Sequence, residues 1–244
     1  MGRTKPPPSW AQAVDRFVAD LVDRERSVHT RANYREDLQA FAGWYQHRFQ
    51  DPPTLAELDR LRGACGVLGA NLGPRLRDML DFAAFTLMRP SELFELRYSD
   101  IDFERNRIRV SRRLYRGEID VPKNGAAKTI ALVPPAREIL LRQPTYVHDT
   151  ALVFVSQLGS RLCAQTLSRY WQRVVAAAHI DRDMPFYLAS KHYGVSRLYE
   201  LGLSERAIAS QAGWSIRSVE HMLDVYGHRE RAAFSEIQAL YEDD

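Results

Sequence analysis

The densest group of side chains that could do chemistry is a run of arginines within twelve residues. Its members are Arg105, Arg107, Arg109, Arg112, Arg113 and Arg116. Glu104 and Glu118 offset only part of their charge. Guanidinium groups spaced along a twisted strand pair can contact the phosphates of a nucleic-acid backbone. The alternative interpretation is a solvated face of a sheet that binds nothing.

Lysine is scarce in this chain, so each lysine position is informative. The lysines are Lys5, Lys123, Lys128 and Lys191, which leaves 30 arginines among the 34 basic residues. Such a bias is typical of a GC-rich genome, and it makes arginine the default cation. A lysine here stands where arginine would be expected.

Motifs for metal and nucleotide chemistry are missing from the sequence. The seven histidines show no His-Glu-x-x-His spacing, and the cysteines show no Cys-x-x-Cys spacing. The sequence has neither a glycine-rich phosphate loop nor a Gly-x-Ser-x-Gly elbow. We therefore expect no metal, no cofactor and no small-molecule substrate, which disfavours hydrolases and nucleotide-dependent enzymes.

The elements that must position these residues are mainly helical. Apolar residues recur at helical spacing over 10–22 and again over 34–45. Arg24, Arg31 and Arg35 cluster around the connection between these two stripes. The pair of stripes predicts a helical hairpin, and its arginines either face phosphates or are solvated.

A proline pair at Pro52-Pro53 ends this pattern and is the best linker candidate. The sequence predicts a flexible leader at 1–8, a helical hairpin at 9–50, a linker at 51–54 and a larger domain at 55–244. Within that domain the alternation of apolar residues predicts strands at 107–110, 118–121 and 128–132. Helical periodicity predicts helices at 54–68, 75–88, 135–142, 164–178, 185–201, 204–212 and 216–226. The expected fold is therefore mainly α with a small antiparallel sheet, an α+β class.

The composition of the chain excludes several classes of protein. The chain has 244 residues, 45% of them hydrophobic and 27% charged, which excludes disordered and collagen-like proteins. No apolar run approaches the roughly 18 residues of a membrane span, and we expect no signal peptide and no membrane partner. The net charge of +3 is by itself a weak indication of a nucleic-acid partner. Cys65 and Cys163 are expected to be buried free thiols in the cytoplasm.

The most informative stretch is residues 86–102, with the sequence TLMRPSELFELRYSDID. It resembles the first conserved box of the tyrosine recombinases, the phage integrase superfamily. The pattern there is a helix end, Arg, two residues, Glu-Leu, and then Leu-Arg-x-x-Asp-Ile. The match is long and ungapped. An unrelated pair of helices joined by a turn is the alternative.

Other segments follow in the order of that family. Lys123, in VPKNG ahead of KTIAL, resembles the catalytic lysine of the family's β-hairpin. The KH pair at 191–192 stands where the family has Arg-His, and the GW pair at 213–214 stands where it has Gly-His or Gly-Trp. The YGH triplet at 226–228 resembles the nucleophile segment. The resemblance covers nearly all of residues 9–240.

The resemblance implies a phosphoryl-transfer site. The oxygen of Tyr226 would attack a DNA phosphodiester and form a 3′-phosphotyrosine. Arg89 and Lys191 would hold the non-bridging oxygens as negative charge develops. Lys123 would protonate the departing 5′ oxygen, and Trp214 would position the phosphate. Because the phosphotyrosine keeps the bond energy, such a reaction needs neither ATP nor metal.

Four features depart from the family pattern. Lys191 replaces the second arginine, and a lysine presents a point charge where arginine presents a rigid fork. Leu188 stands where the family has a His or Lys, and it cannot move a proton. Trp214 and Tyr226 are twelve positions apart, against about nine in most members. The N-terminal hairpin has two helices where relatives have four or more.

A second pattern overlaps the end of this alignment. Residues 204–221 also resemble a helix-turn-helix, in which Arg217, Ser218 and His221 would face the bases. The recombinase alignment already accounts for these helices. The candidate DNA-binding residues are Arg24, Arg31, Arg35, Arg107, Arg109, Arg112, Arg113, Arg116 and Arg217.

A last amphipathic helix is expected at the C-terminus. Its apolar face carries Phe234, Ile237, Leu240 and Tyr241. This face packs either on its own domain or on a neighbouring copy, and the second arrangement would give a homo-oligomer on DNA.

Two classes of function follow. In the first, the chain is a sequence-specific duplex-DNA-binding protein whose catalysis is weak or lost, used for example as a phage regulator or repressor. In the second, it is an active site-specific recombinase with an unusual active site. Lys191 and Leu188 favour the first class, whereas Arg89, Lys123 and Tyr226 favour the second. Both classes place the protein on DNA in the cytoplasm.

Overall fold

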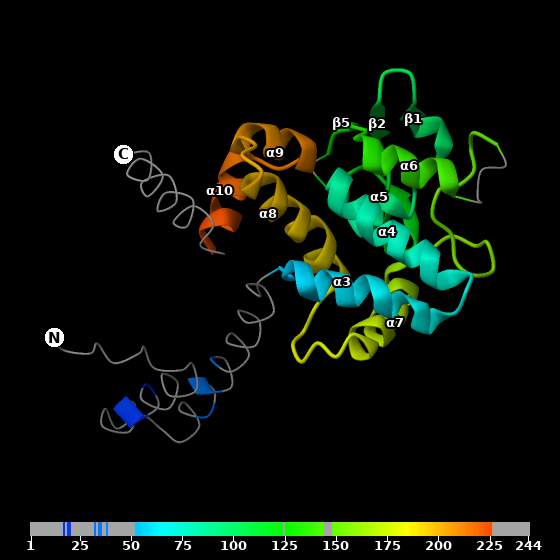
Figure 1. Cartoon of the computed structure of the whole chain (residues 1–244). Helices are drawn as coiled ribbons and strands as arrows, with labels where there is room; N and C mark the ends of the chain where they lie inside the picture. Colours follow the sequence, from blue (N-terminus) through cyan, green and yellow to red (C-terminus); the bar gives the residue numbers. More distant parts are fainter. Residues whose placement is uncertain are drawn as a thin grey trace, which may run out of the picture. The chain divides into compact units, whose positions relative to one another are not determined.

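Two units divide the chain, Met1–Gln50 and Asp51–Asp244 (Figure 1). The computed structural model describes residues 52–123, 125–143 and 148–225 together with seven residues of the first unit. Those seven are helical, and the ring of Phe17 meets the ring of Tyr34 edge-on at 5.8 Å. The two predicted apolar stripes therefore touch at this pair. Arg24 and Arg31 lie outside the described residues, and Arg35 is exposed.

The second unit begins with a helix whose start is fixed by its own side chains. The Thr54 hydroxyl accepts the Glu57 backbone N–H at 3.2 Å, and Glu57 Oε2 accepts the Thr54 N–H at 2.8 Å. This capping box satisfies two of the donors that a helix start leaves unpaired. The helices that follow are α3 (Leu55–Ala64), the 3₁₀ turn η1 (Cys65–Leu68) and α4 (Leu72–Thr86).

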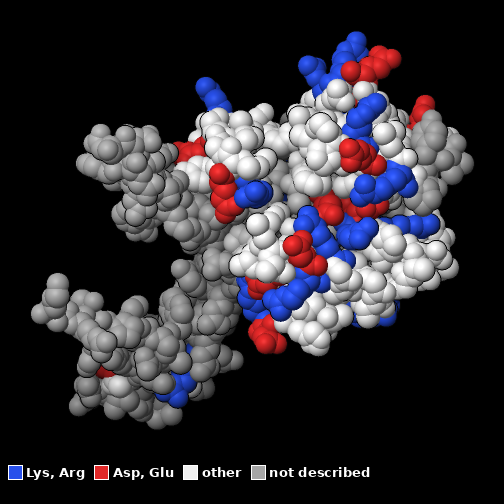
Figure 2. All heavy atoms as spheres, viewed as in Figure 1, with Lys and Arg blue, Asp and Glu red and all other residues white. Residues whose placement is uncertain are grey.

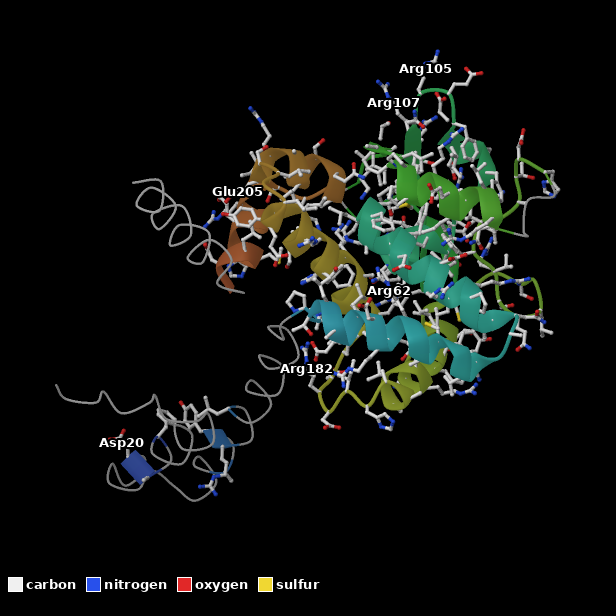
Figure 3. The ribbon with its side chains drawn as sticks, in the orientation of Figure 1. Asp20, Arg62, Arg105, Arg107, Arg182 and Glu205 are labelled. Atoms are coloured by element: carbon white, nitrogen blue, oxygen red, sulfur yellow. The ribbon has the colours of Figure 1, made fainter. Side chains whose placement is uncertain are left out.

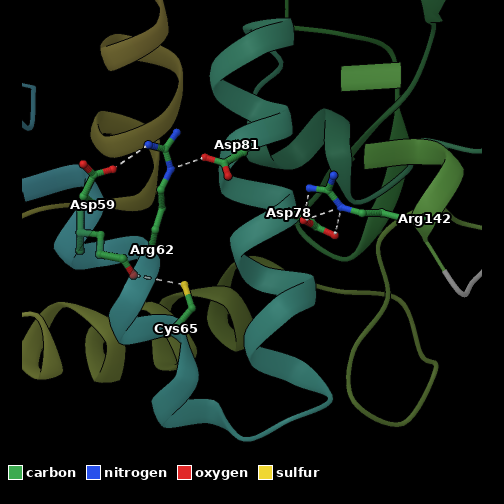
Figure 4. A network of polar contacts seen from close by, with 7 residues as sticks. Asp59, Arg62, Cys65, Asp78, Asp81 and Arg142 are labelled. Carbon is green, nitrogen blue, oxygen red and sulfur yellow. Dashed lines mark hydrogen bonds and ion pairs between the residues drawn. The ribbon is translucent and has the colours of Figure 1, made fainter. Parts of the chain in front are cut away.

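Charged side chains tie these helices to each other and to α6 (Pro134–Arg142) (Figure 4). Arg62 of α3 bonds Asp59 at 3.1 Å and Asp81 of α4 at 2.7 Å. On the other side of α4, the Asp78 carboxylate accepts a hydrogen bond of 2.6 Å from the Arg142 guanidinium. Arg62–Asp81 joins α3 to α4 and Arg142–Asp78 joins α6 to α4, so these two pairs fix how α3 and α6 pack on α4.

The antiparallel strands form one three-stranded sheet and one hairpin. The sheet has the order β1-β2-β5, and the hairpin pairs β3 with β4. The strands are β1 (Ile101–Asp102), β2 (Arg107–Val110), β3 (Arg113–Tyr115), β4 (Glu118–Asp120) and β5 (Lys128–Ala131). In β2 the exposed Arg107 and Arg109 alternate with the buried Ile108 and Val110, as their period-2 pattern predicts. The sequence did not predict β1 or β3, which are only two and three residues long.

Further helices and the loops between them complete the described part of the unit, and α3 packs against α7 near the bottom of Figure 1. These helices are α5 (Pro90–Leu93), α7 (Ala164–Ala177), α8 (Tyr193–Glu200), α9 (Glu205–Ala212) and α10 (Ile216–Val225). The segment predicted as one helix over 185–201 is helical without a break over 186–200, and its residues Leu188–His192 form a π-helix, η3, directly before α8. Such π turns are rare and are frequently found at functional sites. The mainly helical α+β fold with small antiparallel sheets is confirmed.

The backbone at the end of α4 is held by close packing. Leu87 is fully buried and adopts a left-handed conformation, with φ 56°. This conformation costs roughly 1–2 kcal/mol in a non-glycine residue, so the surroundings must stabilise it. Gly194 of α8 supplies the space, since a Cβ there would lie 2.2 Å from the Ala84 carbonyl oxygen and 2.6 Å from Leu87 Cδ2. The turn directs the chain so that Arg89 begins α5.

The two thiols differ in their surroundings. Cys65 is buried, and burial raises its pKa to about 12. Cys163, expected to be buried as well, is partly exposed because it stands at the N-terminal cap of α7. Among the described residues, no helix is long and apolar enough to cross a membrane.

Candidate functional site

The site begins at Arg89, the residue that caps α5. Its guanidinium Nη1 donates to Glu92 Oε1 at 3.2 Å, and its backbone N–H donates to Glu92 Oε2 at 2.9 Å. Glu92 is 1% exposed. This carboxylate therefore fixes both the backbone and the side chain of Arg89.

A second cation reaches Glu92 from the sheet. Lys128, the first residue of β5, places its Nζ 3.3 Å from Glu92 Oε2 and 3.2 Å from the carbonyl oxygen of Ala212. Burial alone would raise the pKa of Glu92, but the Lys128 ammonium, the Arg89 N–H and the charges of Lys191 and Arg89 lower it overall. Burial lowers the pKa of Lys128, and Glu92 opposes that shift. Glu92 is thus ionised beside its cations.

The third cation is Lys191 in η3, which is fully buried. Its Nζ donates to the Ala212 carbonyl oxygen at 2.6 Å and lies 4.8 Å from the centre of the Trp214 ring. Burial, followed by the charges of Lys128 and Arg89, lowers its pKa well below the usual value. Lys191 therefore points at the end of α9 and not outward as a free charge.

Aromatic rings enclose this cluster. His192 packs edge-on against Tyr187 at 4.7 Å and against Trp214 at 5.6 Å. Burial, with a smaller effect of Lys191, lowers the pKa of His192 to about 4, so the imidazole is neutral at pH 7. Burial raises the pKa of Tyr187 to about 12, although a hydrogen bond from Arg89 opposes this. The rings lie beside Lys191, the fully buried cation of the three.

The loop at the end of α9 sets the position of Trp214. Gly213 has φ 63°, a left-handed conformation that glycine adopts without strain. The Trp214 N–H then bonds back to the Ala209 carbonyl at 3.0 Å, which closes a Schellman-type cap. The Ala212 carbonyl is left for side-chain donors.

A cavity of about 1310 Å³ opens beside the cluster. Arg89 and Tyr187 line one part of it, Arg116 of the β3–β4 turn lines another, and the exposed Gln165 and Ser168 of α7 line a third. Polar groups from four segments of the second unit therefore face one space.

The residues predicted for the active site are only partly brought together. Arg89, Lys191 and Trp214 lie in one cluster, as described above. Lys123 is exposed in the turn between β4 and β5. Leu188 is buried at 6% exposure in η3, so an apolar side chain occupies that position. Tyr226 follows the last described residue of α10 and lies outside the described residues, as does the whole segment 234–241 that was predicted to form a C-terminal helix.

The arginine run is less uniform than its sequence density indicates. Arg112 pairs with Asp100 and Arg113 pairs with Asp120 at 2.6 Å, so carboxylates offset both charges. Figure 3 shows Arg105 and Arg107 projecting from the β1–β2 end of the unit. Basic and acidic side chains are interleaved over the face in Figure 2. Among the residues that the structure describes, no carboxylate pairs with the exposed Arg107, Arg109 and Arg116 of this run.

On α10, the second candidate DNA-reading helix, Arg217, Ser218 and His221 are all exposed. The buried Val219, Met222 and Leu223 form its other face. This amphipathic arrangement is compatible with a reading helix and also with a helix that only packs on α9.

Three residues of this cluster are not among those that the sequence predicted for the site: Glu92, Lys128 and Tyr187. The scarcity of lysine is a signal that could have found Lys128. A carboxylate three residues after Arg89 could have indicated Glu92, since it matches the capping position of a helix start. Tyr187 had no local signal. In the part of the chain that the structure describes, no group of three or more His, Cys, Asp or Glu side chains could hold a metal ion.

The chain is similar to a protein-family model and to a known protein. The family model described as the phage integrase family matches residues 54–232. A "Tyrosine recombinase XerC-like" protein of Caldanaerobacter subterraneus subsp. tengcongensis is 25% identical over 184 residues, covering 64% of this chain and 46% of that protein. The chain thus spans about half the length of that relative.

Solved structures share the fold at low sequence identity. The integrase of transposon Tn1549, in complex with circular intermediate DNA, has a TM-score of 0.61 at 20% identity, covering 97% of this chain and 87% of that one. The XerA recombinase has a TM-score of 0.58 at 18% identity, covering 93% and 81%. A lambda integrase tetramer bound to a Holliday junction has a TM-score of 0.51 at 16% identity, covering 88% and 64%.

The resemblance of residues 86–102 and the cluster around Arg89 point to the same family as these comparisons. The matched region includes Arg89, Lys123, Lys191, Trp214 and Tyr226. Because the family model matches well over half of its residues, the chain belongs to the phage integrase family of tyrosine recombinases.

Proposed function

We propose that this chain binds duplex DNA sequence-specifically, that its strand cleavage is weak or lost, and that it serves as a regulator or repressor. The observation that carries the proposal is the position of Lys191. A second arginine would present two parallel N–H groups to two phosphate oxygens. Lys191 instead donates to Ala212 and lies over Trp214, in full burial.

DNA binding is supported by the charges around the site. Arg89, Lys128 and Lys191 face one carboxylate, that of Glu92, and Arg116 lines the adjoining cavity. This arrangement suits the phosphates of a DNA backbone. The integrase of transposon Tn1549 is similar in fold and was solved with DNA bound.

Slow strand cleavage follows from two groups that the chain lacks, an arginine at position 191 and a proton-transfer group at position 188. Loss of one contact that stabilises developing negative charge lowers a rate by about 10²–10³. Leu188 removes a proton-transfer group at a second position, which lowers the rate by a further ~10²–10⁴, although such losses do not simply add. A chain with both changes binds the phosphate but cleaves slowly.

The second candidate is an active recombinase. Arg89 is held by Glu92 in a geometry ready for an anion, and Trp214 stands beside the cluster. With Lys123 and Tyr226 in the sequence, most of the reaction's groups are retained. The two candidates differ in one observable, a covalent bond between the protein and DNA.

The proposal extends to assembly and place of action. The C-terminal helix, with Phe234 and Ile237, would join copies of the chain on DNA. The lambda integrase of similar fold is a tetramer. We expect the protein to act in the cytoplasm, on phage or host DNA.

The test is recovery of bound DNA with and without detergent. The protein is incubated with sheared genomic DNA from its source, and the sample is divided before washing, one half in SDS. Tyr226→Phe is run beside the wild type, and Tyr115→Phe, which changes an exposed tyrosine, is the matched control. We expect specific fragments without SDS, alike for all three proteins.

Two other results would contradict the proposed loss of cleavage or of DNA binding. Fragments that survive SDS with the wild type and with Tyr115→Phe, but not with Tyr226→Phe, establish an active recombinase. Failure to retain any DNA at low salt overturns both candidate functions.

A further inference from the structure

We propose that Lys128 and Lys191 act as a pair that grips one phosphate of bound DNA, which makes Lys128 a phosphate-binding residue of the site. The inference rests on the proposed DNA-binding function. The resemblance to the family predicts Lys123 as the catalytic lysine. The inference assigns a role to a different lysine, Lys128, five positions later in the chain.

The pair is defined by a shared acceptor. Lys128 Nζ lies 3.2 Å and Lys191 Nζ 2.6 Å from the same carbonyl oxygen, that of Ala212. Ala212 is the last residue of α9, so its carbonyl has no partner within the helix. The negative end of the helix dipole also favours cations there. One backbone oxygen therefore gathers an ammonium from β5 and another from η3.

Gly213 makes this approach possible. A Cβ on Gly213 would lie 2.6 Å from Lys128 Cδ and 2.9 Å from Lys128 Nζ. Any side chain at 213 would displace Lys128 from the carbonyl. Gly213 is thus a positioning residue for Lys128 as well as the cap of α9.

The charges facing the pair are not balanced. Arg89 and Glu92 face it from α5, the neutral His192 adjoins Lys191, and Tyr187 contacts Arg89. One carboxylate, that of Glu92, thus serves three cations, of which Lys191 is fully buried and Arg89 and Lys128 are largely buried. Such a cluster either sheds a proton or binds an anion, because an uncompensated buried charge is costly.

A phosphate resolves this imbalance. An ammonium has three donors. Ala212 occupies one on each lysine, and Glu92 occupies a second on Lys128. The remaining donors come from two different elements, so they can meet two oxygens of one phosphate, without the fixed coplanar geometry of a guanidinium. Arrival of the anion also favours full protonation of both lysines. DNA binding should therefore take up a proton.

The first experiment measures the affinity for a short duplex of random sequence as a function of salt concentration. Lys128→Met removes the charge and keeps the length of the side chain. We expect about 10-fold weaker binding at low salt, since a hydrogen bond between charged groups contributes on this scale. The slope of log K against log salt should fall in magnitude by about 0.9, the value for one phosphate contact.

Arg60→Met is the matched control, because Arg60 is an exposed cation on α3 whose guanidinium contacts the His179 carbonyl. We expect it to leave the affinity and the slope close to those of the wild type. If the wild type binds and Lys128→Met behaves like Arg60→Met, the role of Lys128 is refuted while the proposed function stands. If the wild type does not bind, the proposed function itself fails.

The second experiment needs no variant and remains decisive if Lys128→Met does not fold. Calorimetric titration of the wild type with the duplex, at mildly alkaline pH in two buffers of different ionisation enthalpy, measures proton uptake. We expect net uptake, since His192 is already neutral there and the lysine pair is the group that gains a proton. Binding heats that are equal in the two buffers would show that no proton is taken up, and they would refute the proposal that the two lysines bind the phosphate as a pair.

Discussion

Lys191 donates a 2.6 Å hydrogen bond from its ammonium group to the carbonyl oxygen of Ala212, and this bond joins η3 to the end of α9. This bond holds the two elements together and fixes the position of the ammonium group, which has no planar fork. The first prediction therefore concerns residue 191.

Lys191→Arg should raise the yield of covalent protein–DNA complex. A guanidinium extends further than an ammonium and presents a planar fork to two oxygens. Restoring one contact of this type is expected to increase the cleavage rate by about 10²–10³. The measurement is the fraction of SDS-resistant complex formed on recovered genomic fragments.

The double variant Lys191→Arg, Tyr226→Phe is the control, and it should form no such complex. An unchanged yield for Lys191→Arg alone would show that the missing fork does not limit cleavage. The spacing between Trp214 and Tyr226 would then be the better explanation.

Gly194→Ala should destabilise the second unit. Its Cβ would lie 2.2 Å from the Ala84 carbonyl oxygen and 2.6 Å from Leu87 Cδ2, both in a closely packed region. Forcing an extra methyl group into such packing costs about 1–3 kcal/mol. Urea unfolding followed by circular dichroism measures the change.

Gly63→Ala is its matched control in α3, where a Cβ would meet no atom within 4 Å. It should stabilise the protein by about 0.5–1 kcal/mol, because alanine is the better helix former. Equal effects of the two substitutions would contradict the packing of α8 on α4.

Acid should weaken the start of α3 in a defined pH range. The hydrogen bond from Arg182 lowers the pKa of Glu57 from 4.5 to about 2, with the Thr54 cap adding to this effect. A lowered carboxyl pKa contributes stability that is present above pH 4.5 and is lost as the pH falls toward 2. The free energy of unfolding should therefore decline over this range.

Arg182→Gln should flatten that decline and lower the stability at neutral pH. Arg197→Gln, at an exposed pair with Glu200, should leave the slope as in the wild type. A slope that is the same with and without Arg182 would refute the assignment.

His192 should produce a second pH dependence at higher pH. Burial lowers its pKa from 6.5 to about 4, so the unfolded chain binds a proton in this range and the folded chain does not. Stability should fall as the pH drops from 6.5 to 4, by on the order of 3 kcal/mol.

The variant His192→Phe keeps an aromatic ring beside Trp214 and should remove most of this change. His221→Phe alters an exposed histidine of α10 and should not. Urea unfolding at several pH values distinguishes them, and a wild-type slope in His192→Phe would disprove the burial of a neutral imidazole.

The sequence by itself determined the elements and the family. Period-2 alternation placed β2 at Arg107–Val110 and predicted β4 and β5, and helical periodicity placed α7 and α10 to within one residue at each end. The motif at 86–102 identified Arg89 and the family. These features are encoded locally, in periodicity and in short runs of residue types, so no long-range information was needed to find them.

The tertiary structure decided which cations meet. Lys128, Glu92 and Lys191 are far apart in sequence, and they converge because β5, α5, η3 and the end of α9 pack together. The same packing buries His192 and sets its pKa. Charge pairing also separated Arg112 and Arg113 from the exposed Arg107 and Arg109. Burial, distance and the sharing of one carbonyl oxygen are properties of the folded arrangement, and the spacing of residues along the chain does not contain them.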